Sequence, residues 1–176
     1  ALLKKKSDET ETTIDNGATT SQIVFLAKVN TASLAKQTPP NNFPKHKEAF
    51  FRGLDFLFKM QYENGGFPQF FPNREAYYAR VTFNDNATVN ALKIMRDIAD
   101  NHKDFLFVDE ERRKKAADSF KRGIELILKT QIRKKNLPTV WAQQYDEISM
   151  QPVWARKFEP PALCSAESVN IVRLLM

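Results

Sequence analysis

The chain has 176 residues, of which 42% are hydrophobic and 27% charged, so it is long enough and apolar enough to fold around its own core. This composition excludes an intrinsically disordered chain, and no apolar stretch reaches the roughly 18 residues that a membrane-spanning helix needs. The net charge of +6 allows an anionic partner, but no nucleic-acid module signature is present. The single Cys164 excludes an intramolecular disulfide.

Five segments show the three- and four-residue spacing of apolar side chains that is typical of amphipathic helices. In chain order, we expect helices over residues 15–30, 45–62, 86–101, 109–132 and 165–176. In the first helix, the predicted apolar face consists of Ile23, Phe25, Leu26 and Val29. Irregular segments are expected over 37–42, 65–84 and 136–164, with a short strand over 79–83. The sequence therefore predicts an all-α protein with long irregular loops.

Two parts of this pattern occur twice. Residues 52–61, in the second predicted helix, align with residues 122–131 at an offset of 70 (122 − 52). Residues 15–19 and 85–88 each begin with an Asp-Asn pair, and the two pairs are separated by the same offset (85 − 15). A repeated helix pair predicts helical hairpins stacked side by side, in an open solenoid or a closed toroid, because one pair cannot bury its apolar face alone. The last predicted helix still runs at the final residue, so we expect residues 1–176 to be part of one longer domain.

Asp15 and Asp85 each precede a predicted helix, and two interpretations of them are open. Asp is a favoured N-cap residue that contributes about 1 kcal/mol, and the residues alone favour capping. In a closed toroid, however, equivalent helix starts share one rim, where Asp15 and Asp85 would meet the turn 165–167. The second interpretation is therefore that the two carboxylates converge on one mouth and have a chemical function there.

Five further blocks follow one another in the loops and helix starts: Asn64–Gln69, Arg80–Ala87, Val140–Asp146, Pro152–Pro160 and Ser165–Ser168. Together with Thr13–Thr19, this ordered set resembles the family 10 pectate lyases from Thr12 onward. The resemblance implies an incomplete (α/α)3 toroid whose module continues beyond Met176. Phe67 stands where the family often has Trp, and Tyr145 where it often has His.

The resemblance also implies a reaction, the cleavage of polygalacturonate by Ca²⁺-assisted anti-β-elimination to unsaturated oligogalacturonides. The two acidic Ca²⁺ ligands of the family map onto Asp15 and Asp85. Its arginine base, which removes the C5 proton of a galacturonate residue, maps onto Arg156. Because the pKa of arginine is above about 12, a clamp on a carboxylate is the alternative role for Arg156. A further substrate-gripping arginine of the family falls beyond Met176.

We expect the other substrate contacts to come from residues in the same blocks, namely Gln69, Arg80, Asn84, Gln143, Tyr145 and Trp154. The implied partner is an anionic polysaccharide, and the implied protein is a monomer that is secreted or periplasmic in a bacterium. Two other functions stay open, a non-catalytic pectin-binding module and an α/α-toroid glycosidase acting on another polysaccharide. A glycosidase needs two carboxylates across a cleft, and the adjacent Asp146 and Glu147 are not typical of such a pair.

Overall fold

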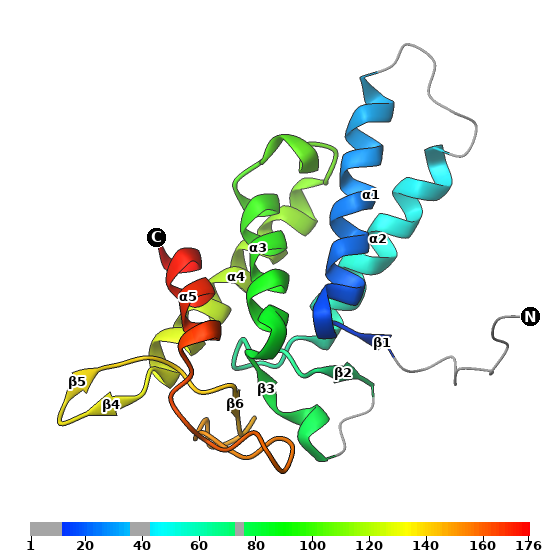
Figure 1. The fold of residues 1–176 in the computed structure, drawn as a ribbon. Helices are drawn as coiled ribbons and strands as arrows, with labels where there is room; N and C mark the ends of the chain where they lie inside the picture. Colours follow the sequence, from blue (N-terminus) through cyan, green and yellow to red (C-terminus); the bar gives the residue numbers. More distant parts are fainter. Residues whose placement is uncertain (1–11, 36–42, 73–75) are drawn as a thin grey trace, which may run out of the picture.

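The computed structural model describes residues 12–35, 43–72 and 76–176, and helices make up most of this part of the chain (Figure 1). The α-helices are α1 (Ala18–Leu34), α2 (Phe43–Met60), α3 (Ala87–Ala99), α4 (Glu110–Thr130) and α5 (Ser165–Leu175). Each of the five predicted helices is confirmed to within a few residues at its ends. The loop predicted over 37–42 lies outside the described residues.

The helices form two rows of stacked hairpins (Figure 1). Helix α1 packs against α2, α3 packs against α4, and α3 also contacts α1 and α5. One row therefore contains α1, α3 and α5, and the other contains α2 and α4. The predicted all-α fold of stacked hairpins is confirmed. The described helices do not close into a ring, so closure into a toroid, and the place of this chain within one domain, stay predictions.

The two hairpins are built alike where their helices touch. A Cβ atom added to Gly53 of α2 would lie 2.8 Å from Ile23 Cγ1 of α1, and one added to Gly123 of α4 would lie 2.2 Å from Leu92 Cδ2 of α3. Each glycine therefore lets its helix approach the partner more closely than a larger residue would permit. The repeated Arg-Gly pattern of the sequence marks this packing contact.

The predicted apolar face of α1 is wrong at one position, because Phe25 is 64% exposed. The buried face of α1 instead includes Ile23, Ala27 and the polar Asn30, whose Nδ2 donates to Leu26 O at 2.9 Å. Close packing against α2 leaves room on this face for small and medium side chains, which explains why the largest residue points outward. The largest fully buried side chains come from both rows and from the loops, and they include Phe50, Leu54, Leu57, Phe67, Phe83, Leu92 and Tyr145.

Short antiparallel contacts hold the segments that precede α1, α3 and α5. Strand β1 (Thr12–Thr13) pairs with β2 (Phe70–Phe71), β3 (Val81–Thr82) pairs with β6 (Gln144–Tyr145), and Trp141 forms a bridge with Cys164. The strand expected over 79–83 is confirmed as β3. The remaining elements are the 3-10 turns η2 (Ala76–Ala79) and η4 (Lys103–Phe105) and the hairpin of β4 (Arg133–Lys134) and β5 (Leu137–Pro138). No helix in the described ranges has both the length and the apolar character of a membrane span.

Candidate active site

Asp15 and Asp85 lie in two neighbouring turns of the same shape, which lead directly into α1 and α3. These are the 3-10 turns η1 (Asp15–Gly17) and η3 (Asn84–Asn86), and they contact each other. The last two residues of each turn have positive φ, at 48° and 72° in η1 and at 51° and 60° in η3. Asn, Asp and Gly tolerate this left-handed conformation, which explains why Asp-Asn pairs occur in both turns.

Equivalent positions in these turns are 69 residues apart, rather than 70. In each turn a threonine hydroxyl at the start of the helix donates to the carbonyl six residues earlier, and these bonds join Thr19 to Thr13 at 2.6 Å and Thr88 to Thr82 at 2.7 Å. In this register Asp15 corresponds to Asn84, and Asp85 corresponds to Asn16. The two aspartates therefore precede equivalent helices, but the offset of 70 seen in the sequence is one residue longer than the structural repeat. They still lie at adjacent helix starts, because the two turns touch.

Neither aspartate caps the helix that follows it. The N-cap residues are Gly17 for α1 and Asn86 for α3, and neither helix start has a side-chain cap hydrogen bond. Asp15 Oδ2 accepts a bond of 3.1 Å from Asn16 Nδ2, whereas Asp15 Oδ1 is buried without a hydrogen-bond partner among the described residues. The capping interpretation is wrong here. A buried oxygen without a donor is costly on its own, so this atom is suited to an external ligand.

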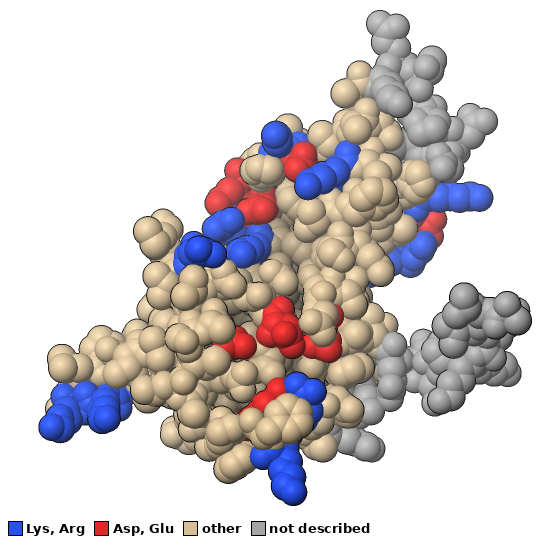
Figure 2. Space-filling model, in the orientation of Figure 1, with Lys and Arg blue, Asp and Glu red and all other residues tan. Residues whose placement is uncertain are grey.

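A third carboxylate, Glu167 of α5, lines the same pocket as Asp85. Asp85 and Glu167 line a pocket of about 220 Å³ together with Asn86 and Asn170. Asn170 Nδ2 donates to Asn86 Oδ1 at 2.8 Å and ties α5 to η3. Figure 2 shows acidic side chains gathered in the middle of this face, where α1 and α3 begin. Partial burial raises the pKa of Asp85, and the negative charges of Asp15 and Glu167 raise it further. Repulsion of this kind is relieved when a cation binds.

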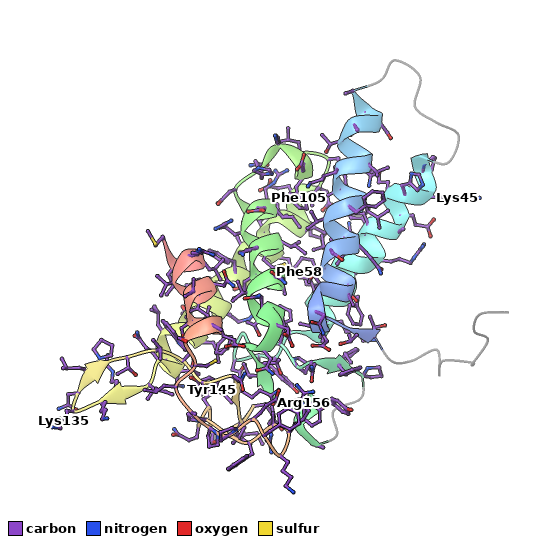
Figure 3. The ribbon with its side chains drawn as sticks, in the orientation of Figure 1. Lys45, Phe58, Phe105, Lys135, Tyr145 and Arg156 are labelled. Carbon is purple, nitrogen blue, oxygen red and sulfur yellow. The ribbon has the colours of Figure 1, made fainter. Side chains whose placement is uncertain are left out.

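Arg156 approaches these carboxylates from the loop between β6 and α5, near the start of α3 (Figure 3). It is close enough that its charge opposes the rise in the pKa of Asp85. Its guanidinium donates to Glu159 through Nε at 2.9 Å and Nη2 at 2.5 Å, and its Cζ lies over the Phe158 ring, 4.8 Å from the centroid. The bonds to Glu159 raise the pKa of Arg156 above its ordinary value, so the guanidinium keeps its proton.

Two of the expected substrate-binding residues, Gln143 and Asn84, lie directly beneath this face, and a third, Trp154, is exposed in the loop that carries Arg156. Trp154, two residues before Arg156, is 58% exposed and presents an aromatic surface. Gln143 is partly exposed, and its carbonyl accepts from Phe83 N at 2.8 Å, which fixes the loop beneath η3. Asn84 is buried in η3, where Nδ2 donates to Glu159 Oε1 at 3.2 Å and Oδ1 has no partner among the described residues.

The other three are engaged within the protein. The Tyr145 side chain is fully buried, and its hydroxyl oxygen accepts from Ala142 N at 2.7 Å. Burial raises the pKa of Tyr145 to about 12, and a direct substrate contact would require the ring to leave the core. Gln69 is buried, and its backbone carbonyl accepts from the Thr13 hydroxyl at 2.8 Å, whereas its side-chain Oε1 has no partner among the described residues. Arg80 is held by carboxylates, as described below.

Arg80 Nη1 donates to Asp146 Oδ2 at 2.5 Å and to Glu147 Oε2 at 2.9 Å. The two adjacent carboxylates therefore converge on one guanidinium instead of pointing apart. Hydrogen bonds from Ser149 hold the pKa of Asp146 below its ordinary value, and the positive charge of Arg80 makes a smaller contribution in the same direction. This pair is an internal ion bridge of the loop, and a substrate carboxylate would have to compete with it for Arg80.

Two acidic residues of this region, Glu159 and Glu167, were not among the predicted site residues. Both lie inside the blocks that carry the family resemblance, but their sequence spacing does not reveal which side chains they contact. Glu159 follows Arg156 by three residues in a loop, a spacing that predicts contact on a helix and not elsewhere. Its burial and its bonds to Arg156 and Asn84 become visible only in the folded chain.

A family model described as pectic acid lyase matches residues 2–176. The chain belongs to the pectic acid lyase family. Among solved structures, the family 10 polysaccharide lyase from Cellvibrio cellulosa is similar to it with a TM-score of 0.86 and 31% identity. A mutant of a family 10 polysaccharide lyase from the same organism, in complex with trigalacturonic acid, is similar with a TM-score of 0.86 and 30% identity. No curated protein sequence matches.

These matches confirm the resemblance to family 10 lyases. They cover 99% of the present chain, but only 54% and 55% of the two solved chains. The chain thus spans about half the length of the structures that it resembles. The activity of the whole protein therefore belongs to the proposal that follows.

Proposed function

We propose that this member of the pectic acid lyase family contributes to the active site of a pectate lyase that cleaves polygalacturonate by Ca²⁺-assisted anti-β-elimination. The observation that supports this most is the unpartnered Asp15 Oδ1 beside Asp85, within the electrostatic reach of Arg156. The complex of a similar lyase with trigalacturonic acid supports a galacturonate polymer as substrate. A net charge of +6 also favours association with a polyanion.

Asp15 and Asp85 would hold the Ca²⁺ ion. Ca²⁺ takes oxygen ligands in loose geometry, and Asp15 Oδ1 has no donor in the described chain that the ion would have to displace. No three His, Cys, Asp or Glu side chains in the described ranges are grouped to hold a metal by themselves, so the other ligands are expected from substrate and water. When bound, the ion would offset the charge of the substrate carboxylate and make the adjacent C5 proton more acidic.

Arg156 is the proposed base for the C5 proton. As the base takes the C5 proton, the electron pair of the C5–H bond forms the C4=C5 double bond, the C4–O4 bond breaks, and O4 of the departing chain takes a proton from water. The pairing with Glu159 raises the pKa of Arg156 and so favours the protonated guanidinium, which suits the alternative role as a carboxylate clamp. Base catalysis therefore requires an alkaline medium and neighbouring positive charge to supply free guanidine.

The Arg156→Lys variant separates the two roles through its pH–rate profile. An ordinary lysine titrates near 10.4, about two or more pH units below arginine. If residue 156 is the base, kcat/KM of the variant reaches a plateau near that pH while the wild type still rises. If residue 156 is a clamp, the two profiles are parallel and the variant is slower throughout, because lysine cannot make a two-point contact.

The function itself is tested with the whole natural protein, polygalacturonate and Ca²⁺ at alkaline pH, by following the ultraviolet absorbance of unsaturated products. We expect a rise that a Ca²⁺ chelator abolishes. No rise refutes the lyase proposal; substrate binding without turnover would instead indicate a pectin-binding module. New reducing ends without absorbance would indicate a glycosidase, which the bridging of Asp146 and Glu147 by Arg80 disfavours.

We infer that the protein acts outside the cytoplasm, either secreted or in the periplasm of a bacterium. The reason is the size of the proposed polymeric substrate, which cannot reach an enzyme enclosed by a membrane. We also propose that it acts as a monomer.

A further inference from the structure

Glu159 is a buried carboxylate in a loop whose neighbouring side chains are exposed. It is 7% exposed, whereas Phe158 beside it is 72% exposed. Burying a carboxylate is costly unless its oxygens are paired. Both oxygens are paired here: Oε1 accepts from Arg156 Nη2 and Asn84 Nδ2, and Oε2 accepts from Arg156 Nε and from the Arg156 backbone N–H at 3.1 Å. These bonds lower the pKa of Glu159 and keep it ionised.

These bonds fix the guanidinium of Arg156 in a plane. Two parallel donors, Nε and Nη2, grip the carboxylate, and the Phe158 ring covers one face of the group. The remaining terminal nitrogen, Nη1, has no partner among the described residues. A backbone bond from Glu159 N to Arg156 O at 2.8 Å closes the same short loop. Arg156 thus offers one free nitrogen in a defined direction.

Asn84 connects this unit to the acidic side of the site. Its Nδ2 reaches Glu159, and the next residue in the chain is Asp85. Asn84 is itself fixed, because it is buried and its backbone N–H donates to Gln143 O at 3.3 Å. The orientation of Arg156 is therefore tied, through one side-chain hydrogen bond, to the turn that carries Asp85.

We propose that Glu159 is a positioning residue for the elimination, which together with Asn84 holds the Arg156 guanidinium in register with Asp85 so that both act on one sugar residue. This inference rests on the proposed lyase function. Glu159 does not touch substrate in it, and acts only through Arg156. A carboxylate that merely stabilised the loop would not depend on Arg156 for its effect on the rate.

The test uses Glu159→Gln in the whole natural protein, because glutamine keeps the size and can still accept from Asn84. We expect kcat on polygalacturonate to fall on the order of 10²-fold, the usual effect of displacing a reacting group by about 1 Å. KM should change much less. Glu110→Gln is the matched control, because Glu110 also pairs with an arginine three residues away, Arg113, at 3.0 Å, and it lies at the start of α4. That control should retain wild-type kcat.

Arg156→Lys and the double variant Glu159→Gln/Arg156→Lys complete a mutant cycle. If Glu159 acts through Arg156, the double variant is no slower than Arg156→Lys alone. Independent, multiplying losses would overturn the inference, as would wild-type kcat in Glu159→Gln. A wild type without lyase activity would instead remove the proposed function, and this inference with it.

A readout that does not depend on turnover is the Nε–H resonance of Arg156, identified by its loss in Arg156→Lys. In the wild type, the bond to Glu159 should protect this proton from exchange with water. Glu159→Gln should make its exchange at least several-fold faster, since a neutral acceptor holds it more weakly. Equal exchange in the two proteins would show that the tether is absent in solution, and would also overturn the inference.

Discussion

Replacing Asp85 by asparagine and by alanine should separate the effect of its charge on stability from the effect of its left-handed backbone conformation. Asp85 has a φ of 51° and no hydrogen bond to its carboxylate within the described residues, so asparagine can replace it without strain or a lost bond. Asp85→Asn removes the repulsion from Asp15 and Glu167 that helps to raise the pKa of Asp85. Because Asp85 is only partly buried and solvent screens its charge, the gain should be modest, about 0.2–1 kcal/mol without Ca²⁺.

Asp85→Ala should behave differently, although it removes the same charge. Alanine in the left-handed region costs about 1–2 kcal/mol, so this variant should be less stable than Asp85→Asn by roughly that amount. Urea unfolding without Ca²⁺ measures both effects, and both variants should lose Ca²⁺-dependent lyase activity. Equal stability of the two variants would refute the backbone argument. Retained Ca²⁺-dependent activity in Asp85→Asn would refute the metal role.

Three further predictions concern the elements around the site. Tyr145→Phe leaves Ala142 N–H buried without an acceptor, so urea unfolding should show a loss of about 1–3 kcal/mol with little change in KM; a large rise in KM would indicate direct substrate contact. Gly65→Ala places a Cβ atom 2.2 Å from Arg122 O at a φ of 93°, and should lower the unfolding free energy by more than about 2 kcal/mol. Gly17→Ala, whose added Cβ would meet its nearest neighbour at 3.7 Å, is its control and should cost only the strain of a left-handed alanine, about 1–2 kcal/mol. The lowered pKa of Glu159 means that its ionised form stabilises the fold, so the stability advantage of wild type over Glu159→Gln should be full above the ordinary glutamate value of 4.5 and shrink as pH falls below it; an advantage that grows in acid would contradict this sign.

Helices α2 to α5 were predictable because each carries its apolar face at a regular spacing, and the repeat at an offset of 70 predicted the stacked hairpins. The apolar face of α1 was harder to predict, because Phe25 is exposed and the polar Asn30 is buried. The sequence could not distinguish the function of an aspartate before a helix. Asp109 does cap α4, with its carboxylate accepting from Arg112 N at 2.9 Å, whereas Asp15 and Asp85 cap nothing. The difference lies in the backbone. Asp109 is extended and is itself the N-cap of α4, whereas the left-handed turns at 16–17 and 85–86 make Gly17 and Asn86 the N-caps of α1 and α3.

The candidate site was predictable in part, because some of its residues lie in recognisable sequence blocks. Asp15, Asp85 and Arg156 came from blocks in a recognisable order, and the structure places them within electrostatic reach. The burial of Tyr145 and the pairing of Glu159 depend on how loops far apart in the sequence lie against each other. Single-sequence patterns carry no information on such contacts, so these two residues could be judged only in the folded chain.

The one-residue shift between the two turns has a consequence for how the proposed polymeric substrate binds. Two repeated turns that carried the same carboxylate at the same position would offer two like subsites to successive sugar residues of the proposed polygalacturonate substrate. Here one turn presents its carboxylate at the first position and the other at the second, so the two halves differ although the scaffold repeats. We therefore expect the acidic pair to form one asymmetric subsite for a single sugar residue, and not two equivalent subsites.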